Sequence, residues 1–222
     1  MTAIDRGTIE YKNEILRKGI HICSLSIPTI YYFITKELAL QILIPLALFS
    51  IILDLGRYFI PSFKKPFYAI FGSLLRDHEK NEKNKKLSGA TYVLLSAFIM
   101  VAFFPKVIVV TAFSILILSD TFAALIGRKF GKHKFLLKSF EGSFAFFLVG
   151  IVIILLTPKV GNEVMEYVIG FIAVIIGTIV ENISSGYADD NLTIPISIGL
   201  TMWGLYSILM PNLNLVLHNV PL

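Results

Sequence analysis

The sequence has little charge and almost no cysteine. Only 16% of its 222 residues are Asp, Glu, Lys or Arg, whereas a soluble domain carries about a quarter. The single cysteine, Cys23, excludes an intramolecular disulfide. No Ser/Gly/Pro-rich linker, internal repeat or low-complexity run divides the chain, so we expect one domain over residues 1–222. The shortage of charge argues against a soluble globular protein.

The common phosphate-binding loops are also missing from the sequence. The chain contains neither GxxxxGK[ST] nor GxGxxG. These absences exclude a P-loop nucleotide site and a dinucleotide-binding turn of the Rossmann type. Any phosphate chemistry must therefore use another arrangement of glycine and basic residues.

Long apolar runs dominate the sequence instead. Hydrophobic residues make up 55% of the chain, and seven runs approach the ~20 residues that a helix needs to cross a bilayer. At this length, only helices satisfy their backbone hydrogen bonds within lipid. The sequence therefore predicts an all-α, polytopic integral membrane protein with about seven transmembrane helices. The expected spans are 19–35, 38–55, 88–104, 107–126, 140–157, 164–180 and 192–210.

The basic residues predict the orientation. Of the 20 Lys and Arg residues, 17 precede the first span or lie in the loops 56–87 and 127–139, which share one side if the spans alternate. The other side has only Lys36, Lys106 and Lys159. Because Lys and Arg gather on the cytoplasmic side, we expect a cytoplasmic N-terminus. The net charge of +5 then reflects contact with anionic membrane lipids, and we expect no nucleic-acid partner.

One carboxylate interrupts an apolar run. Asp120 lies in the fourth expected span, between ILILS and TFAALIG. A carboxylate at membrane depth costs several kcal/mol unless it faces a partner or a polar cavity, so Asp120 is a candidate functional residue. The alternative is a buried Asp that pairs with Lys or Arg and holds helices together.

The fourth span ends in GRKFGKHK. Gly127 and Gly131 would let backbone N–H groups approach a bulky anion. Arg128 and Lys132 supply charges that suit phosphate. Basic loops at the cytoplasmic ends of spans commonly have this composition, so the pattern by itself leaves both interpretations open.

The next span begins with KSFEGS, which includes Lys138, Glu141, Gly142 and Ser143. The N-terminus of a helix has free N–H groups and binds anions. A carboxylate beside it can hold a divalent metal that bridges phosphates. The alternative is a glutamate that interacts favourably with the helix dipole.

A second acidic cluster lies on the same expected side, in ENISSGYADDNLTIP. It contains Glu181, Asp189, Asp190 and Asn191 and no basic residue. These side chains can pair with the surrounding Lys and Arg residues or bind Mg²⁺. An Asp or Asn before LTIP is also a good helix N-cap.

Two other segments lie on this side. Arg17 and Lys18 are at the mouth of the first span, where long basic side chains can also simply reach the membrane interface. In loop 56–87, the first half, through Leu75, predicts an amphipathic interfacial helix. We expect the second half to be a solvated connector.

Four blocks carry a resemblance to a known family. They are EILRKGIH (14–21), KLSGATYVLL (86–95), SDTFAALIGRKFGKHKFLLKSFEGS (119–143) and ENISSGYADDNLTIP (181–195). Their order and spacing resemble the CTP-dependent lipid kinases, namely dolichol kinase, phytol kinase and the yeast-type diacylglycerol kinase, in their small, single-module form. The resemblance implies that the γ-phosphate of CTP is transferred to the hydroxyl of a lipid alcohol at the cytoplasmic membrane face, with Mg²⁺ as cofactor.

The sequence also resembles a neighbouring family, the CDP-diacylglycerol synthases, which use CTP to activate phosphatidate. They share the Asp, a GRxFGK stretch and a Lys-x-x-Glu-Gly stretch. In them, a Ser-Pro-Lys-Lys-Thr run precedes Glu-Gly, where this chain has LLKSFEG. The kinase is therefore the leading hypothesis and a cytidylyltransferase the second.

The kinase resemblance implies roles for individual residues. Asp120 and Glu141 are the expected Mg²⁺ ligands. Asp189 or Asp190 is a second metal ligand or the base that accepts the hydroxyl proton, and the full expected catalytic set is Asp120, Asp189, Asp190 and Lys138. The expected nucleotide- and phosphate-binding residues are Arg17, Lys18, Gly127, Arg128, Gly131, Lys132, Ser139, Gly142, Ser143 and Asn191.

Two other classes of protein are alternatives. A transporter would also contain an intramembrane Asp, but the sequence has neither the internal symmetry nor the paired half-helices expected of one. A non-catalytic scaffold would not need Asp120 and Glu141.

Overall fold

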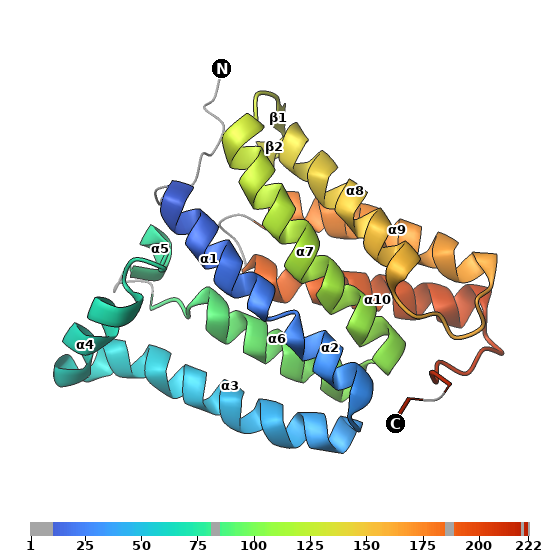
Figure 1. Cartoon of the computed structure of the whole chain (residues 1–222), viewed down its shortest axis with the longest axis horizontal. Helices are drawn as coiled ribbons and strands as arrows, with labels where there is room; N and C mark the ends of the chain where they lie inside the picture. The colour runs from blue at the N-terminus through green and yellow to red at the C-terminus, as the bar shows by residue number, and fades with distance from the viewer. Residues whose placement is uncertain (1–10, 81–84, 185–188, 219, 222) are drawn as a thin grey trace.

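The computed structural model describes residues 11–80, 85–184, 189–218 and 220–221, and this part of the chain is almost entirely helical (Figure 1). The elements run from α1 near the N-terminus to α10 before the C-terminal segment. Their bounds are α1 Tyr11–Cys23, α2 Ser26–Phe33, α3 Lys36–Phe59, α4 Pro61–Phe71, α5 Asp77–Lys80, α6 Gly89–Phe103, α7 Lys106–Phe130, β1 Lys134–Phe135, β2 Lys138–Ser139, α8 Phe140–Leu156, α9 Val164–Ile183 and α10 Asp190–Leu209.

Polar side chains mark the starts of several helices. Thr35 accepts a hydrogen bond from the backbone of Leu38 at 3.3 Å and caps α3. Ser88 caps α6 and Ser139 caps α8 in the same way. These caps satisfy N–H groups that have no partner within the helix. The helix bounds show that each expected span from the second onward coincides with a helix.

The first expected span, residues 19–35, is not one helix. α1 ends at Cys23, and α2 begins at Ser26 after a turn in which the N–H of Leu25 bonds to the carbonyl of Ile22 at 2.9 Å. Pro28, in the first turn of α2, has no backbone N–H to continue the earlier helix. The prediction of one continuous span here was therefore wrong.

Within the described residues, four helices are long and apolar enough to cross a membrane, namely α3, α7, α9 and α10. α6 and α8 are apolar but shorter. The prediction of a helical membrane protein is confirmed in this form. The count of seven spans and the side of the N-terminus stay predictions.

α7 is the central helix of the bundle. It packs against α8, α10, α2 and α1 (Figure 1), and its apolar side chains are buried along most of its length. Close packing elsewhere uses glycine: a Cβ on Gly150 of α8 would lie 2.7 Å from a methyl carbon of Val174 on α9. Small residues at helix contacts are typical of bundles in lipid, where van der Waals packing drives association.

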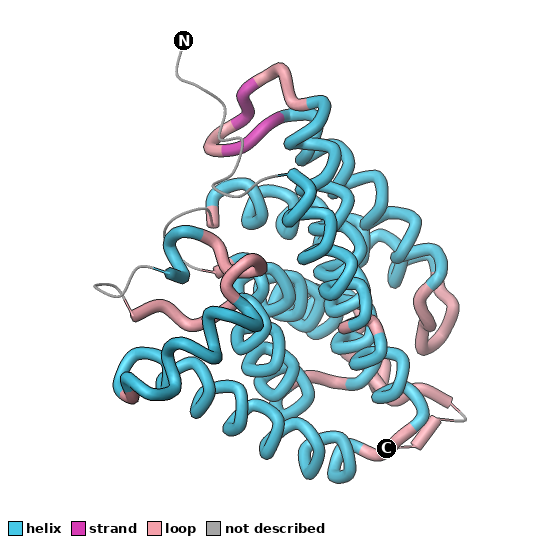
Figure 2. Tube along the Cα trace, turned by 60° about the vertical axis from the view of Figure 1, so that its left-hand side comes forward, coloured by secondary structure: helices cyan, strands magenta, loops and turns pink. Residues whose placement is uncertain are grey.

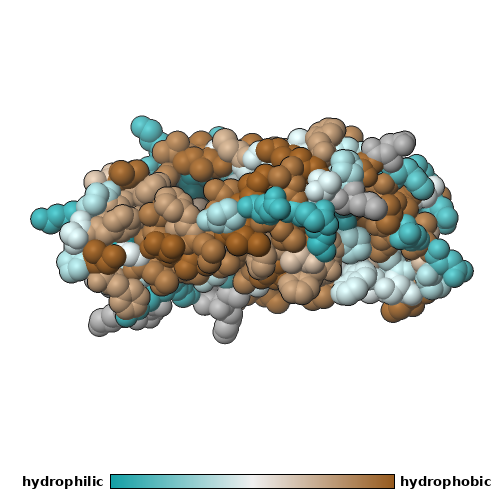
Figure 3. All heavy atoms as spheres, turned by 90° about the horizontal axis from the view of Figure 1, so that it is seen from below, coloured by the Kyte–Doolittle hydropathy of each residue, from teal (hydrophilic) through white to brown (hydrophobic). Residues whose placement is uncertain are grey.

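The outside of the bundle is apolar. On α3, Leu48, Phe49 and Ile52 are all more than half exposed. Figure 3 shows hydrophobic side chains over much of one face, with hydrophilic ones gathered at its two ends and in one narrow patch. A soluble monomer rarely has so large a continuous apolar surface, and its extent indicates contact with lipid.

The short elements gather at one end of the bundle. α4, α5 and the hairpin β1–β2 lie at the same end as the start of α1 and the C-terminal end of α7 (Figure 1). Figure 2 shows the hairpin projecting from the helices. The interfacial helix predicted in loop 56–87 is present as α4, but its position relative to a membrane stays a prediction. The charged blocks of the sequence converge at this end.

Candidate functional site

The site begins with α1, a helix whose polar face is turned inward. Glu14, Arg17, Lys18 and His21 recur at helical spacing, and Glu14 and Lys18 are buried. The opposite face exposes apolar residues, among them Leu16 at 54% and Ile20 at 51%. A helix with charges inward and aliphatic side chains outward suits a polar site enclosed by protein next to lipid.

Lys18 reaches the intramembrane carboxylate. Its ammonium group pairs with Oδ2 of Asp120 on α7, and both residues are only 2% exposed. Nε2 of His21 lies 3.6 Å from the same oxygen. Removing either partner would leave an uncompensated buried charge, which is strongly unfavourable. The pair thus explains how Asp120 is tolerated at this depth, and it locks α1 onto α7.

Glu14 joins two of the expected phosphate-binding arginines. Its carboxylate accepts from Arg17 at 2.6 Å and lies 3.2 Å from Nη1 of Arg128 at the end of α7. Burial alone would raise the pKa of Glu14, but Arg17 and then Lys18 lower it below its ordinary value. Glu14 was not among the site residues predicted from the sequence, and its position three residues before Arg17 was the available signal.

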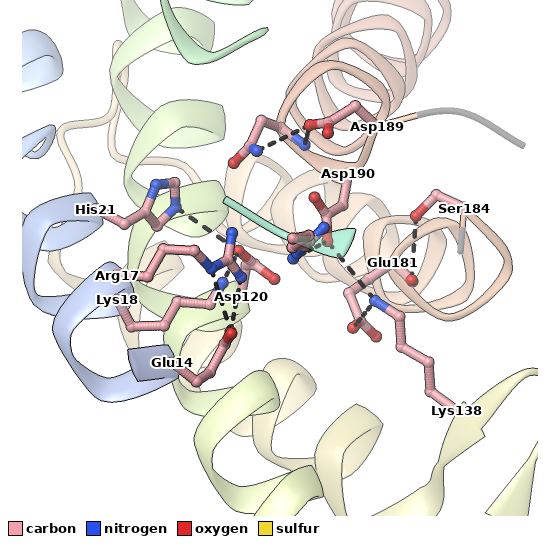
Figure 4. Close-up of polar contacts among 12 residues, drawn as sticks. Glu14, Arg17, Lys18, His21, Asp120, Lys138, Glu181, Ser184, Asp189 and Asp190 are labelled. Atoms are coloured by element: carbon pink, nitrogen blue, oxygen red, sulfur yellow. Dashed lines mark hydrogen bonds and ion pairs between the residues drawn. The ribbon is translucent and has the colours of Figure 1, made fainter. Parts of the chain in front are cut away.

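The second half of the site surrounds Lys138, which the hairpin brings to α9 and α10. Its ammonium lies 2.5 Å from Glu181 and 3.9 Å from Asp190. Burial would lower the pKa of Lys138, whereas Glu181 and Asp190 raise it above the ordinary value. The lysine is therefore charged, and Asp190 lies between the Lys138–Glu181 pair and the Lys18–Asp120 pair (Figure 4).

Asn182 fixes the hairpin in place. Its side-chain oxygen accepts from the backbone N–H groups of Leu137 at 2.8 Å and Lys138 at 3.1 Å. Its amide nitrogen donates to Ser143 at 2.7 Å. One buried side chain on α9 thus holds both the hairpin and the start of α8. Ser143 accepts this hydrogen bond, and its expected role in binding phosphate stays a prediction.

Arg76 enters the site from the loop between α4 and α5. Its guanidinium lies 3.5 Å from Oδ2 of Asp190, 114 positions away in the sequence. Asp190 and then Asp189 raise the pKa of Arg76, against burial, which would lower it. From the sequence, this part of the loop was predicted to be a solvated connector. A mixed run of both charges has no pattern that distinguishes one inward-facing arginine.

Asp189 caps α10. Its Oδ1 accepts from the backbone and the side-chain nitrogens of Asn191 at 3.0 and 2.8 Å. Burial, together with the neighbouring charge of Asp190, raises the pKa of Asp189 to about 7. The N-cap expected here is present, and the raised pKa means that this capping carboxyl is also easily protonated. Residues 185–188 of the same block lie outside the described residues.

The glycines of GRKFGK occupy a helix contact. A Cβ on Gly127 would lie 2.9 Å from Oγ of Ser139 and 3.3 Å from Cα of Gly142. One on Gly142 would lie 3.0 Å from the carbonyl oxygen of Ala123, and Gly131 is similarly close to Ser139. These three glycines let α7 approach Ser139 and α8, and this packing is sufficient to explain why the three positions lack side chains.

Glu141 does not lie with the other carboxylates. Its side chain accepts from Nδ1 of His133 at 2.7 Å, and from the backbone N–H of His133 at 3.2 and 3.3 Å. This contact ties the start of α8 to the residues that follow α7. Lys132 beside it is exposed. Asp120, Asp190 and Glu181 thus lie near one another, whereas Glu141 lies beside the hairpin.

The acidic groups of the site suit a magnesium ion that is shared with phosphates. Among the residues that the structure describes, no three His, Cys, Asp or Glu side chains form a ready-made metal cluster. However, Oδ1 of Asp190 and Oε2 of Glu181 are buried and have no hydrogen-bond partner among the described residues. Mg²⁺ is usually held by one or two carboxylates together with substrate phosphates. The donors present fit that mode.

In this arrangement, the carboxylates of Glu14, Asp120, Glu181 and Asp190 each lie beside a basic side chain. An incoming polyanion could replace the carboxylates beside Arg17, Lys18, Arg128 and Lys138, and the released carboxylates could bind a cation or accept a proton. The fold and the site define an α-helical membrane protein with a polar, charge-paired site at one end of its bundle.

Comparison with known proteins gives a family. The chain is 32% identical over 191 residues to the uncharacterized protein RP860 of Rickettsia prowazekii, and the match covers 86% of this chain and 93% of that protein. The chain therefore belongs to the family of RP860. No protein-family model matches it, and no solved structure matches it either.

Two enzymes are more distant relatives. CTP-dependent diacylglycerol kinase 1 of Schizosaccharomyces pombe is 32% identical over 101 residues, which is 44% of each chain. The Saccharomyces cerevisiae enzyme of the same name is 33% identical over 152 residues, covering 66% of this chain and 51% of the kinase. The chain thus spans about half the length of these kinases. This homology supports the lipid-kinase resemblance over the cytidylyltransferase alternative.

Proposed function

We propose that the protein is a CTP-dependent kinase that transfers the γ-phosphate to the hydroxyl of a lipid alcohol at the cytoplasmic membrane face. The observation that carries the proposal is the convergence of Lys18–Asp120, Lys138–Glu181 and Asp190 at one end of an apolar bundle. The distant homology to CTP-dependent diacylglycerol kinases supports the same donor and the same class of acceptor.

The basic side chains would bind the triphosphate. Phosphoryl transfer requires in-line positioning and neutralisation of charge more than covalent help. Arg17 and Arg128 share Glu14, so an entering phosphate can take both guanidinium groups from one carboxylate. Lys138 stands on the other side of Asp190, so the phosphates would lie between the two groups of cations. Lys132, exposed between the end of α7 and the start of β1, would meet the outer part of the nucleotide.

Asp189 is suited to accept the proton of the lipid hydroxyl. A general base works best when its pKa is near the operating pH, and burial raises the pKa of Asp189 to about 7. We therefore assign Asp189 as the base and Asp190 as a metal ligand. Asn191 holds the Asp189 carboxyl through two hydrogen bonds, which would keep one of its oxygens oriented toward the acceptor.

Asp120 and Asp190 would hold the magnesium ion. Oδ1 of Asp190 is buried with no hydrogen-bond partner in the described part of the chain, and Asp120 would be released once a phosphate attracts Lys18. When bound, Mg²⁺ would neutralise charge on the β- and γ-phosphates. The metal-binding role expected for Glu141 stays a prediction from the sequence.

The lipid would approach from the apolar side of α1. Ile15, Leu16 and Ile20 are exposed on the face opposite the charges, so an acyl chain can lie along this helix while its hydroxyl reaches the polar face. Diacylglycerol is the first acceptor to test because it is the substrate named for the distant relatives. Polyprenols and phytol present a similar hydroxyl, and apolar walls discriminate such chains weakly.

The test uses purified protein in liposomes with Mg²⁺, CTP labelled at the γ-phosphate, and a panel of diacylglycerol, dolichol, phytol and phosphatidate. Label on an alcohol supports the proposal and identifies the acceptor. Release of pyrophosphate only in the presence of phosphatidate would contradict it and establish a cytidylyltransferase. Label from ATP in place of CTP would retain the kinase and change the donor.

A further inference from the structure

The loop between α3 and α6 is fastened to the end of α3 at several points, and Arg76 connects it to the site. Oδ2 of Asp54, near the end of α3, accepts from the backbone and hydroxyl of Ser88 at 2.7 and 2.8 Å and from Thr91 at 2.6 Å. Arg57, 1% exposed, donates to the carbonyl oxygen of Lys86 at 2.8 Å. The end of the loop is therefore held against α3 by buried polar contacts.

The middle of the loop is held as well. The hydroxyl of Tyr58 accepts from Arg57 at 2.9 Å and lies 2.9 Å from the carbonyl oxygen of Glu79. Glu79 is 2% exposed, and its carboxylate accepts from the backbone N–H of Arg76 at 3.1 Å. Such a chain of buried hydrogen bonds is costly to break. It places Arg76 at a defined position, which a solvated connector would not do.

Arg76 and Lys138 are the more exposed cations of the site, and the side chain of Lys138 is 27% exposed. The side chain of Arg76 is 22% exposed, whereas that of Lys18 is 2% exposed and lies deep between α1 and α7. Its contact with Asp190 is 3.5 Å long, compared with about 2.7–2.9 Å for a strong charge-assisted hydrogen bond. Arg76, like Lys138, is thus within reach of a soluble anion, and the contact with Asp190 holds it loosely.

We propose that Arg76 is a further phosphate-binding residue, which exchanges Asp190 for the triphosphate when the nucleotide enters. The planar guanidinium group can bind phosphate oxygens through two N–H groups at once. The exchange leaves Oδ2 of Asp190 with only the 3.9 Å contact to Lys138, beside Oδ1, which has no hydrogen-bond partner among the described residues. Binding of the triphosphate and exposure of an acidic ligand would then be a single event. This inference rests on the proposed function for the identity of the anion.

The experiment measures binding, so that it does not depend on catalysis. Full-length protein in detergent is titrated with sodium tripolyphosphate, and separately with CTP, while thermal unfolding is followed. Arg76→Ala should weaken the apparent Kd for both about 10- to 100-fold, the range expected for loss of a hydrogen bond to a charged group. Arg76→Lys, which keeps the charge opposite Asp190 and shows whether loss of fold explains the effect, should bind with intermediate affinity.

Lys65→Ala is the matched control. Lys65 is an exposed basic residue on α4 of the same loop, so the variant has the same change in net charge. It should bind within threefold of the unchanged protein. Equal weakening in Lys65→Ala and Arg76→Ala would reduce the effect to general charge and overturn the inference.

The remaining outcomes separate this inference from the proposed function. Unchanged tripolyphosphate affinity in Arg76→Ala, or failure of the unchanged protein to bind tripolyphosphate, overturns the role of Arg76 whatever the enzyme does. Weakened binding in a protein that phosphorylates no alcohol supports the role of Arg76 and contradicts the kinase. If Arg76→Ala weakens only binding of phosphatidate micelles, Arg76 contacts the lipid phosphate, and the assignment to the triphosphate is overturned.

Discussion

Lys18 of α1 and Asp120 of α7 form an ion pair that is buried on both sides, 102 positions apart in the sequence. The pair combines a structural role and a functional role, which were alternatives for Asp120 in the sequence. It fastens α1 to the central helix, and it places a carboxylate beside Asp190 and Lys138. The two roles make different predictions when only one partner is changed.

Asp120→Asn should lower turnover at least 100-fold in protein that is still folded at the assay temperature, although its melting temperature should fall because Lys18 loses its opposite charge. The amide can still accept a hydrogen bond from Lys18, but it cannot carry the negative charge that the proposed metal site requires. The measurement is the initial rate of lipid phosphorylation, alongside the melting temperature in detergent. A variant with near-normal rate would remove Asp120 from the catalytic machinery.

The stability contribution of the pair is tested by a double substitution. Lys18→Met alone should destabilise the protein by about 3–5 kcal/mol, because Asp120 is left as a buried, unpaired charge. Adding Asp120→Leu should recover most of that loss, since apolar replacements of a buried pair are often neutral or stabilising. Unfolding in denaturing detergent measures both. Equal destabilisation in the single and double variants would show that packing, not charge, causes the effect.

Gly127→Ala should destabilise the contact between α7 and α8. The new methyl would lie 2.9 Å from Ser139 Oγ, and overpacking of this kind typically costs about 1–3 kcal/mol. Gly204→Ala is the control, because nothing lies within 4 Å of a Cβ on this glycine in α10, and alanine is favoured in a helix. The two melting temperatures should move in opposite directions.

The outcome at Gly127 also separates packing from ligand binding. If Gly127→Ala melts like the unchanged protein but binds tripolyphosphate poorly, Gly127 is needed for approach of the anion. Lower stability with retained binding would assign it to helix packing.

Asp189 makes stability depend on pH in a defined direction. Burial and the charge of Asp190 raise the pKa of Asp189 to about 7 from 3.8, so the fold favours the protonated carboxyl. Its contribution to stability is complete below about pH 4 and is lost as the pH rises through about 7. Asp189→Asn cannot ionise and remains a good N-cap. The melting temperature of this variant relative to the unchanged protein should therefore rise between pH 5 and pH 8.

Asn191→Ala tests whether the pH dependence of stability requires the side-chain hydrogen bond from Asn191 to Asp189. Removing the amide takes one of the hydrogen bonds to the Asp189 carboxylate without changing its charge. The pH dependence of stability should therefore persist in this variant. A flat difference between Asp189→Asn and the unchanged protein across this pH range would contradict the raised pKa.

Much of the fold follows from local properties of the chain. Whether a segment forms an apolar helix depends on the average hydrophobicity of its own residues and on capping side chains such as Thr35 and Ser88. The same locality made Asp120 conspicuous, because a single carboxylate in an apolar run is visible without any knowledge of its neighbours. The break between α1 and α2 is also local, but Pro28 signals it only weakly.

The partners of the charged residues were decided by the tertiary structure. Lys18 and Asp120, Lys138 and Glu181, and Arg76 and Asp190 are paired by the way whole helices and one loop pack together. The sequence by itself determined that the chain forms apolar helices with charges clustered near their ends. Only packing decided which charges meet, because opposite charges attract across any short distance, and the rotation and contact of remote helices set that distance.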